Sequence, residues 1–320
     1  MSIQIVRIER GRKIADGPVL AMETLDGVPL GVARVLETAA GQARQLGAPL
    51  AVLQLEPDPR RALESQAAAF ALASRDQELR ALDRLGVERL YVLAFDQSLA
   101  AMTHEDFARE ILRDTLGVRH VVATPQVSYG HRCLGGRQQL LDAGVRFGFG
   151  VTLVQPSGGE GAHPGDQIRA LLEQGQVNRV AALFGRPFAI EGVVQHGAAL
   201  GRTIGFPTAN VSLADYARPA AGTYASISRL ADGRILPSLS YIGRRPTIDD
   251  GDPCLEVHIF DFSEDLYGQV IETALIEYLR PDERFESLDA MREQMVVDLR
   301  QGYMHAQAMR SKTLFDFPVG

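Results

Sequence analysis

The feature that most constrains the fold is a change of pattern along the chain. Between residues 18 and 155, short apolar runs alternate with segments whose apolar residues recur at helical spacing. After Pro187, strand-like runs follow one another, separated by clusters of Gly, Pro, Asp and Arg, until a last helical segment. A chain that changes in this way is expected to form two domains, and 320 residues are enough for two ordinary cores.

The first pattern predicts an α/β domain with a parallel sheet, because strands that alternate with helices are joined by crossovers that cover both faces of the sheet. Thr103 suits the N-cap of one helix, with Glu105 and Asp106 in its first turn. The predicted strands are 19–22, 50–55, 90–94, 120–123 and 149–154, and the predicted helices are 31–45, 77–85 and 103–116.

The second pattern predicts an all-β domain, either an antiparallel sandwich or a small barrel. Ser287 suits the N-cap of a final helix that runs to about residue 305. The predicted strands are 189–195, 223–229, 236–242, 255–262 and 271–278.

A stretch rich in Gly, Pro and Ser at 156–164 is typical of a loop or linker, and two short helical segments follow it at 166–173 and 177–184. We therefore predict a first domain at 1–184 and a second at 185–320.

Charge and composition exclude several classes of function. The formal net charge is −7 and no long basic run occurs, which argues against nucleic-acid binding by a basic face. No segment approaches the roughly 20 apolar residues of a membrane span, and the polar first 17 residues do not resemble a signal peptide. Cys133 and Cys254 fit buried free thiols in a reducing cytosol better than a single disulfide. We expect a cytoplasmic protein without a membrane or nucleic-acid partner; no pattern indicates its oligomeric state.

A glycine-rich segment after the first strand of the second half is a candidate phosphate-binding loop. Gly197, Gly201 and Gly205 would let backbone N–H groups approach phosphate oxygens, and Arg202 adds a fixed positive charge. No Gly-Lys-Ser/Thr follows, so the segment is not a Walker A loop. Glycine spacing alone favours a simple turn between two strands.

Oxygen-bearing side chains follow this segment. Thr208 and Asn210 are two residues apart, so they face the same side if the chain is extended. Mg²⁺ prefers oxygen ligands and usually keeps waters and substrate phosphates as its other ligands. The pair therefore suits a Mg-ATP site better than a closed metal cage.

The run GRTIGFPTANV at 201–211 resembles the signature of the riboflavin kinase family, and the resemblance extends over about 185–300. Further segments agree with the family in order and spacing: Gly222-Thr223-Tyr224-Ala225, Ile242-Gly243-Arg244-Arg245-Pro246-Thr247, Leu255-Glu256-Val257-His258-Ile259-Phe260-Asp261-Phe262, Asp265-Leu266-Tyr267-Gly268, and Leu279-Arg280-Pro281 with Phe285. The resemblance implies a six-stranded antiparallel β-barrel with a terminal helix. It also implies an enzyme that transfers the γ-phosphate of ATP to riboflavin, giving FMN and ADP.

The resemblance assigns roles to individual residues. Glu256 would be the general base for the ribityl 5′-hydroxyl, and Thr208 and Asn210 would ligate Mg²⁺. Such a carboxylate is physically reasonable, because phosphoryl transfer needs an aligned hydroxyl whose proton has an acceptor. Tyr241 departs from the family, which often has Asn there. The expected ATP-binding residues are Gly197, Gly201, Arg202, Gly205, Phe206 and Thr208.

Bacterial members of the family usually carry an N-terminal FMN adenylyltransferase domain, which residues 18–184 resemble in length and layout as a Rossmann-like nucleotidyltransferase fold. The nucleotide-binding turn of active members has the form F-D-G-x-H-x-G-H, and residues 25–32 occupy its place. Asp26, Gly27 and Gly31 are retained, whereas Pro29 and Val32 replace the two histidines. Imidazoles at such a turn stabilise the charge that develops on the α-phosphate, and neither replacement supplies a donor.

Three further segments of this half depart from the family pattern, at 56–59, 123–130 and 164–169. We therefore expect a first domain that folds without adenylylating FMN and serves packing, oligomerisation or binding of another ligand. One alternative is a bifunctional FAD synthetase with unusual residues, which would make FAD as well as FMN. Another is a non-catalytic flavin- or nucleotide-binding regulator, which would bind riboflavin without turnover. Of the histidines only His196, beside the glycine-rich segment, attracts functional interest.

Overall fold

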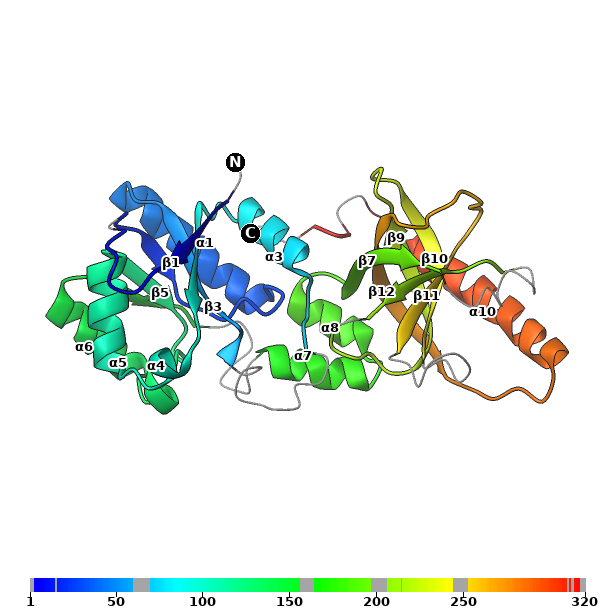
Figure 1. The fold of residues 1–320 in the computed structure, drawn as a ribbon. Helices are drawn as coiled ribbons and strands as arrows, with labels where there is room; N and C mark the ends of the chain where they lie inside the picture. The colour runs from blue at the N-terminus through cyan, green and yellow to red at the C-terminus, as the bar shows by residue number, and fades with distance from the viewer. Residues whose placement is uncertain are drawn as a thin grey trace. The chain divides into compact units, whose positions relative to one another are not determined.

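Parallel and antiparallel strands occupy different parts of the chain, as the sequence pattern predicts (Figure 1). The computed structural model describes residues 3–14, 16–59, 70–155, 164–196, 206–213, 215–243, 253–309, 311 and 314–316. The chain divides into two units, one of residues 1–67, 78–161 and 318–320 and one of residues 68–77 and 162–317. The boundary at 184/185 stays a prediction; in this division, residues 162–184 go with the second unit.

The first unit is built on a six-stranded sheet in the order β1-β4-β3-β2-β5-β6, in which every neighbouring pair is parallel. Its strands are β1 Gln4–Ile8, β2 Val19–Ala21, β3 Leu50–Glu56, β4 Arg89–Ala94, β5 His120–Ala123 and β6 Gly150–Leu153. The helices in this part of the sequence are α1 Leu30–Leu46, α3 Arg75–Arg84, α4 Gln97–Ala100, α5 His104–Asp106, the π-type helix η1 Phe107–Thr115, the short 3₁₀ turn η2 His131–Cys133 and α6 Arg137–Phe147.

Helices cover both faces of this sheet, which explains why its strands are almost continuously apolar. On one face, Leu20 and Val121 belong to a buried cluster that also holds residues of η1 and α6. On the other, α1 contacts β2, β3 and β5, and Val19 of β2 is fully buried. Thr103 caps its helix as predicted, accepting a hydrogen bond from the backbone N–H of Asp106 at 3.0 Å.

Four described elements of the first unit were not predicted: β1, α6 and the short α4 and η2. β1 is an edge strand with three exposed or nearly exposed positions, so its apolar residues do not form a recognisable run. α6 has a weak apolar stripe and an internal glycine, Gly144. That glycine is required by packing, because a Cβ there would lie 2.8 Å from the Phe149 carbonyl oxygen.

The second unit contains a closed barrel of six antiparallel strands in the order β10-β11-β8-β7-β12-β9, which confirms the predicted architecture. Its strands are β7 Ala189–Gln195, β8 Ala209–Ser212, β9 Gly222–Arg229, β10 Ile235–Gly243, β11 Cys254–Ile259 and β12 Val270–Pro281. Its helices are α7 Pro164–Glu173, α8 Val177–Phe184 and α10 Leu288–Met309; α10 packs along β9, β10 and β12. Ser287 caps α10, accepting a hydrogen bond from the N–H of Ala290 at 3.1 Å.

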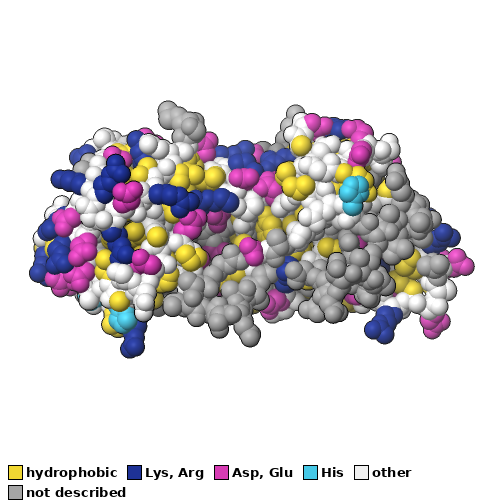
Figure 2. Space-filling model, in the orientation of Figure 1, with side chains coloured by type: hydrophobic (Ala, Val, Ile, Leu, Met, Phe, Trp, Pro, Cys, Tyr) yellow, Lys and Arg dark blue, Asp and Glu magenta, His cyan; other side chains and the backbone are white. Residues whose placement is uncertain are grey.

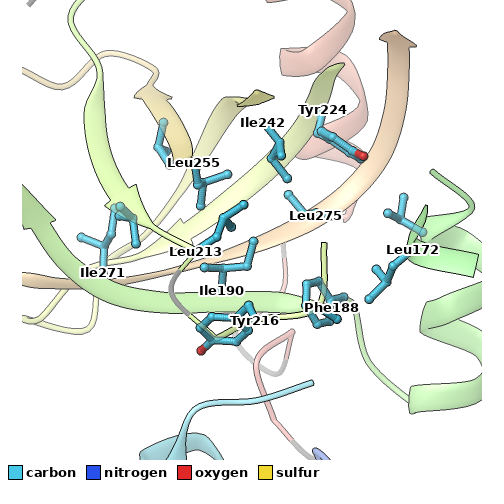
Figure 3. Packing of buried hydrophobic residues seen from close by; sticks show 14 of the residues in the cluster. Leu172, Phe188, Ile190, Leu213, Tyr216, Tyr224, Ile242, Leu255, Ile271 and Leu275 are labelled. Atoms are coloured by element: carbon cyan, nitrogen blue, oxygen red, sulfur yellow. The ribbon is translucent and has the colours of Figure 1, made fainter. Parts of the chain in front are cut away.

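The barrel interior is filled by large apolar side chains from all parts of the unit (Figure 3). Phe188, Ile190 and Tyr224 are completely buried there. Buried hydroxyls of Ser226 and Ser238 hydrogen-bond each other at 2.8 Å, so these polar groups are paired inside the wall. Alternate residues of each strand point outward, and this alternation positions the candidate site described below.

Residues 70–77, from the first half of the sequence, are part of the second unit. Leu72 joins the barrel core and is 1% exposed. Gln77, also 1% exposed, donates to Glu272 Oε1 at 2.6 Å and to the Ala189 carbonyl at 3.1 Å, and accepts from the Tyr216 hydroxyl at 2.9 Å. Because Gln77 satisfies buried polar groups of the barrel wall, this segment contributes to the stability of that unit.

The surface and the thiols can be described for part of the chain. Within the described residues, no helix is long and apolar enough to cross a membrane. On the face shown in Figure 2, Lys and Arg side chains are interspersed with Asp and Glu. Cys133 and Cys254 are both free thiols, but Cys133 is exposed and Cys254 is partly exposed, so the expected burial is wrong.

Candidate functional site

The register of three neighbouring strands brings the predicted general base Glu256 between one predicted metal ligand, Asn210, and Tyr241. Asn210 of β8 lies directly opposite Glu256 of β11, and Glu256 lies directly opposite Tyr241 of β10. Their chain neighbours Val211 and Leu255 point into the barrel core. The three polar side chains therefore share the outer face of the wall, where residues opposite one another in an antiparallel pair have Cβ atoms about 4.5–5.5 Å apart.

The same register continues around the barrel in both directions. Gln195 of β7 lies opposite Asn210, Thr223 of β9 lies opposite Tyr241, and Arg280 of β12 lies opposite Thr223. We call this set the polar row; its members are Gln195, Asn210, Glu256, Tyr241, Thr223 and Arg280. It links segments that are separated by up to 85 residues in the sequence, counted from Gln195 to Arg280.

Arg280 anchors one end of the polar row to α10. Its Nε lies 2.9 Å from Asp298 Oδ2, and its Nη2 lies 2.8 Å from the same oxygen. The Asp298 side chain is 3% exposed and also accepts from Gln294 Nε2 at 2.8 Å. A buried charge pair with these additional hydrogen bonds fixes the helix on the wall, because loss of either partner would leave a charge buried and unpaired.

At the other end of the row, the chain that leads into β8 is held by β11. His258 Nδ1 hydrogen-bonds the Pro207 carbonyl at 2.9 Å, and the rings of Phe206 and His258 meet edge to face at 6.1 Å. Thr208, which is partly buried, lies between these contacts and Asn210. The local geometry thus presents a hydroxyl and an amide oxygen two residues apart, next to Glu256.

Part of the predicted site cannot be placed. Gly197, Gly201, Arg202 and Gly205 lie outside the described residues. Phe206, Thr208, Asn210 and Glu256 are described, and strand pairing places Asn210 beside Glu256. Among the residues that the structure describes, no group of three His, Cys, Asp or Glu side chains could hold a metal ion. A divalent cation at Thr208 and Asn210 would therefore depend on substrate oxygens for its remaining ligands.

Tyr241 is the functional candidate that the sequence noted only as a departure from the family. Burial raises the pKa of its phenol, and the hydrogen bond to Asp282 and the negative charges of Asp282 and Glu256 raise it further. Tyr241 therefore stays protonated beside Glu256. Its side-chain partner Asp282 lies 41 residues further along the chain, so only the tertiary structure reveals the pair.

The turn at 25–32 in the first unit combines an unusual backbone conformation with apolar side chains at positions 29 and 32. Val28 has φ +55°, an unusual conformation for a β-branched residue, and the Gly27 N–H donates to Glu78 Oε1 at 3.3 Å. Pro29 is the N-cap of α1 and makes no side-chain capping bond, while Val32 is 4% exposed. Asp26 is 8% exposed. The positions where histidines were expected are therefore apolar and buried.

A carboxylate near this edge of the sheet was not predicted. Glu23 follows β2 and accepts a hydrogen bond from the N–H of Thr124, which follows β5, at 2.7 Å. Burial raises its pKa, and the hydrogen bonds from Thr124 oppose that effect. The carboxyl ends of parallel strands are where α/β proteins bind ligands, so position after a strand was the signal that could have identified Glu23.

Comparison with known proteins accounts for both units. A family model described as riboflavin kinase matches residues 184–304, and one described as FAD synthetase matches residues 12–163. The bifunctional riboflavin kinase/FMN adenylyltransferase of Escherichia coli K12 is 34% identical over 284 residues, covering 88% of this chain and 91% of the relative. The protein of the same name from Pseudomonas fluorescens is 35% identical over 285 residues, with the same coverage.

A crystal structure described as a macrolide-efflux protein from Streptococcus pneumoniae has the same fold. It is 26% identical, aligns with a TM-score of 0.82, and covers 93% of this chain and 98% of its own.

These comparisons correct one expectation. The relatives are named for both activities and match across both units, so the doubt about the first unit, based on Pro29 and Val32, finds no support in them. They favour the alternative of a chain with two activities. The chain belongs to the bifunctional riboflavin kinase/FMN adenylyltransferase family.

Proposed function

We propose that the barrel unit transfers the γ-phosphate of ATP to the 5′-hydroxyl of riboflavin, giving FMN and ADP. The observation that carries this proposal is the strand register that sets Glu256 between Asn210 and Tyr241 on the outer wall. In phosphoryl transfer the protein mainly aligns the attacking hydroxyl and offsets phosphate charge. In the polar row, Glu256 is suited to align the hydroxyl, and Asn210 beside it is suited to ligate a cation that offsets phosphate charge.

Glu256 is the general base in this proposal. It is partly exposed on the wall, so a substrate hydroxyl can reach its carboxylate and be oriented by a hydrogen bond. The proton of the hydroxyl passes to the carboxylate as the oxygen attacks the γ-phosphorus and ADP leaves.

Thr208 and Asn210 would hold Mg²⁺ together with ATP. Their hydroxyl and amide oxygens are hard donors of the kind that Mg²⁺ prefers. The ion, when bound, neutralises charge on the phosphates. The buried position of Asn210, at 8% exposure, limits the directions its amide can take and so favours a fixed ligand oxygen.

For the first unit we propose FMN adenylylation, which makes FAD from FMN and ATP. The match to the FAD synthetase model over residues 12–163 supports it. Because Pro29 and Val32 supply no donor, charge on the α-phosphate would be offset by other groups, such as backbone N–H groups at the start of α1. We therefore expect adenylylation by this chain to be slower than phosphorylation.

One incubation tests both activities. The purified chain is mixed with riboflavin, ATP and Mg²⁺, and riboflavin, FMN and FAD are separated by chromatography. FMN formation supports the kinase, and later FAD formation supports the second activity. FMN without FAD would return the first unit to the inactive role suggested by Pro29 and Val32. Riboflavin binding without any product would instead support a flavin-binding regulator.

A further inference from the structure

Tyr241 occupies a position in the polar row that the proposed reaction does not yet use. It lies directly opposite Glu256 on the neighbouring strand, on the side away from Asn210. Thr223 lies on its other side, and Arg280 beyond Thr223 is already paired with Asp298. Tyr241 is therefore a bulky residue beside the proposed general base Glu256, on the opposite side of Glu256 from the proposed cation ligand Asn210.

The ring of Tyr241 is directed along its own strand, over Gly243. A Cβ at Gly243 would lie 2.5 Å from Cζ and 2.6 Å from Cε1 of the Tyr241 ring. No other residue could stand at 243 without displacing the ring, because real Cβ atoms do not approach other atoms so closely. The glycine therefore gives the phenol a place to lie flat along the wall instead of projecting away from it.

The hydroxyl of Tyr241 has an acidic neighbour. The exposed carboxylate of Asp282, which follows the end of β12, lies close enough to the hydroxyl to help raise the pKa of the phenol. Phenol and carboxylate form a charge-assisted pair, which is stronger than a bond between neutral groups. Backbone pairing, the Gly243 recess and Asp282 thus restrict the ring to one orientation next to Glu256.

We propose that Tyr241 is a positioning residue for the acceptor alcohol: its fixed ring forms the wall against which the polyol chain of the flavin lies while the terminal hydroxyl meets Glu256. This inference rests on the proposed kinase function. An aromatic face packs well against C–H groups of a polyol, and its rigidity places the hydroxyl at low entropic cost. The side chain does not take the proton; Glu256 does.

The ring and the hydroxyl of Tyr241 have different roles in this proposal. The ring supplies the wall, whereas the hydroxyl only holds the ring. Tyr241→Phe should therefore retain most of the function, and Tyr241→Ala should lose it. Small errors of alignment at a reacting group cost about 10²-fold in rate, so we expect kcat/KM for riboflavin to fall about 10- to 100-fold in Tyr241→Ala. We expect a change within about threefold for Tyr241→Phe.

The test uses the full chain and two substrates. Steady-state FMN formation is measured for the wild type, Tyr241→Ala, Tyr241→Phe and the control Val270→Ala, with riboflavin varied at fixed ATP and then the reverse. Val270 is an exposed residue of β12, 44% accessible, outside the polar row. Riboflavin binding is titrated separately by quenching of flavin fluorescence, and thermal melting checks the fold of each variant.

The expected result is a selective loss: Tyr241→Ala raises the KM and the Kd for riboflavin about tenfold, leaves the KM for ATP within about twofold, and Tyr241→Phe restores riboflavin binding. Unchanged riboflavin parameters in Tyr241→Ala, or an equal loss towards both substrates, would overturn the proposal. The binding titration keeps this result separate from the proposed function. A wild type that binds riboflavin but makes no FMN refutes the kinase, while the Tyr241→Ala titration still decides on the wall.

Discussion

The nucleotide turn of the first unit and the polar row of the barrel differ in what they preserve. At the turn the backbone is special, with Val28 at φ +55°, yet Pro29 and Val32 are apolar and buried. In the row the backbone is ordinary antiparallel sheet, yet Asn210, Glu256 and Tyr241 present polar groups side by side. The turn thus has an unusual backbone with apolar side chains, whereas the row has a regular backbone with hydrogen-bond donors and acceptors.

This difference indicates that the backbone shape of a site and its chemical groups depend on different residues. The turn conformation is enforced by packing of α1 against the parallel sheet, which requires apolar residues such as Val32. The row is placed by barrel closure, and its outward side chains lie outside the apolar core of the barrel, although Arg280 also holds α10 through Asp298. Outward polar residues at consecutive strand positions therefore report on chemistry, whereas a preserved turn reports mainly on the fold.

The largest expected effect tests whether the polar row is catalytic. Glu256→Gln removes the proton acceptor while keeping the shape, so we expect FMN formation to fall about 10²- to 10⁴-fold. The matched control is Glu264→Gln, because Glu264 is an exposed carboxylate that pairs with Arg234 at 2.6 Å, outside the row. Turnover of Glu256→Gln above one tenth of wild type would contradict the assignment.

The next prediction concerns hydrogen-bond donors introduced at the turn of the first unit. Pro29→His with Val32→His should raise the rate of FAD formation about tenfold or more, since a single positioned donor is commonly worth about 10²–10³ in rate. FMN formation should not change. FAD formation is followed by chromatography with FMN as substrate, and melting curves verify folding because Val32 is buried. A folded double variant with unaltered FAD formation would show that other groups carry that step.

The barrel unit also depends on residues 70–77, which a boundary at 184/185 would separate from it. Gln77→Ala removes the buried hydrogen bonds that Gln77 makes with Glu272, Tyr216 and the Ala189 carbonyl, and we expect a loss of about 2–3 kcal/mol in the free energy of unfolding. Denaturant unfolding measures this, with Gln138→Ala as the control because Gln138 is exposed and bonds only Asp142 in the first unit. Equal free energies of unfolding for the two variants would show that residues 70–77 do not stabilise the barrel unit.

The smallest expected effect concerns pH and the first unit alone. Burial lowers the pKa of His120, whose ring hydrogen-bonds Thr152 at 2.8 Å and lies over Gly150. A depressed histidine pKa means that the unfolded chain binds the proton more readily, so stability is present above the ordinary histidine pKa and is lost as pH falls below it. Melting of the wild type should fall more between pH 7.5 and 5.5 than melting of His120→Gln. Parallel curves for the two proteins would contradict this.

Much of the fold follows from local pattern. The helix at 30–46, the strand at 120–123 and the caps at Thr103 and Ser287 all match expectation, because period and capping chemistry act within a few residues. β8 was not predicted as a separate strand: its four residues were taken as part of the glycine-rich motif. A strand of four residues carries too few side chains for its periodicity to be distinctive.

The two-unit architecture, the family and the candidate residues Thr208, Asn210 and Glu256 can be predicted from the sequence. Each of these depends on the local order of residues or on the identity of a motif. Only the tertiary structure decided that Tyr241 stands against Glu256, that Gly243 makes room for its ring, and that residues 70–77 complete the barrel unit. These relations depend on strand register and on hydrogen bonds between distant segments. Such non-local pairings are selected by the closure of the whole barrel and leave no periodic trace in the chain.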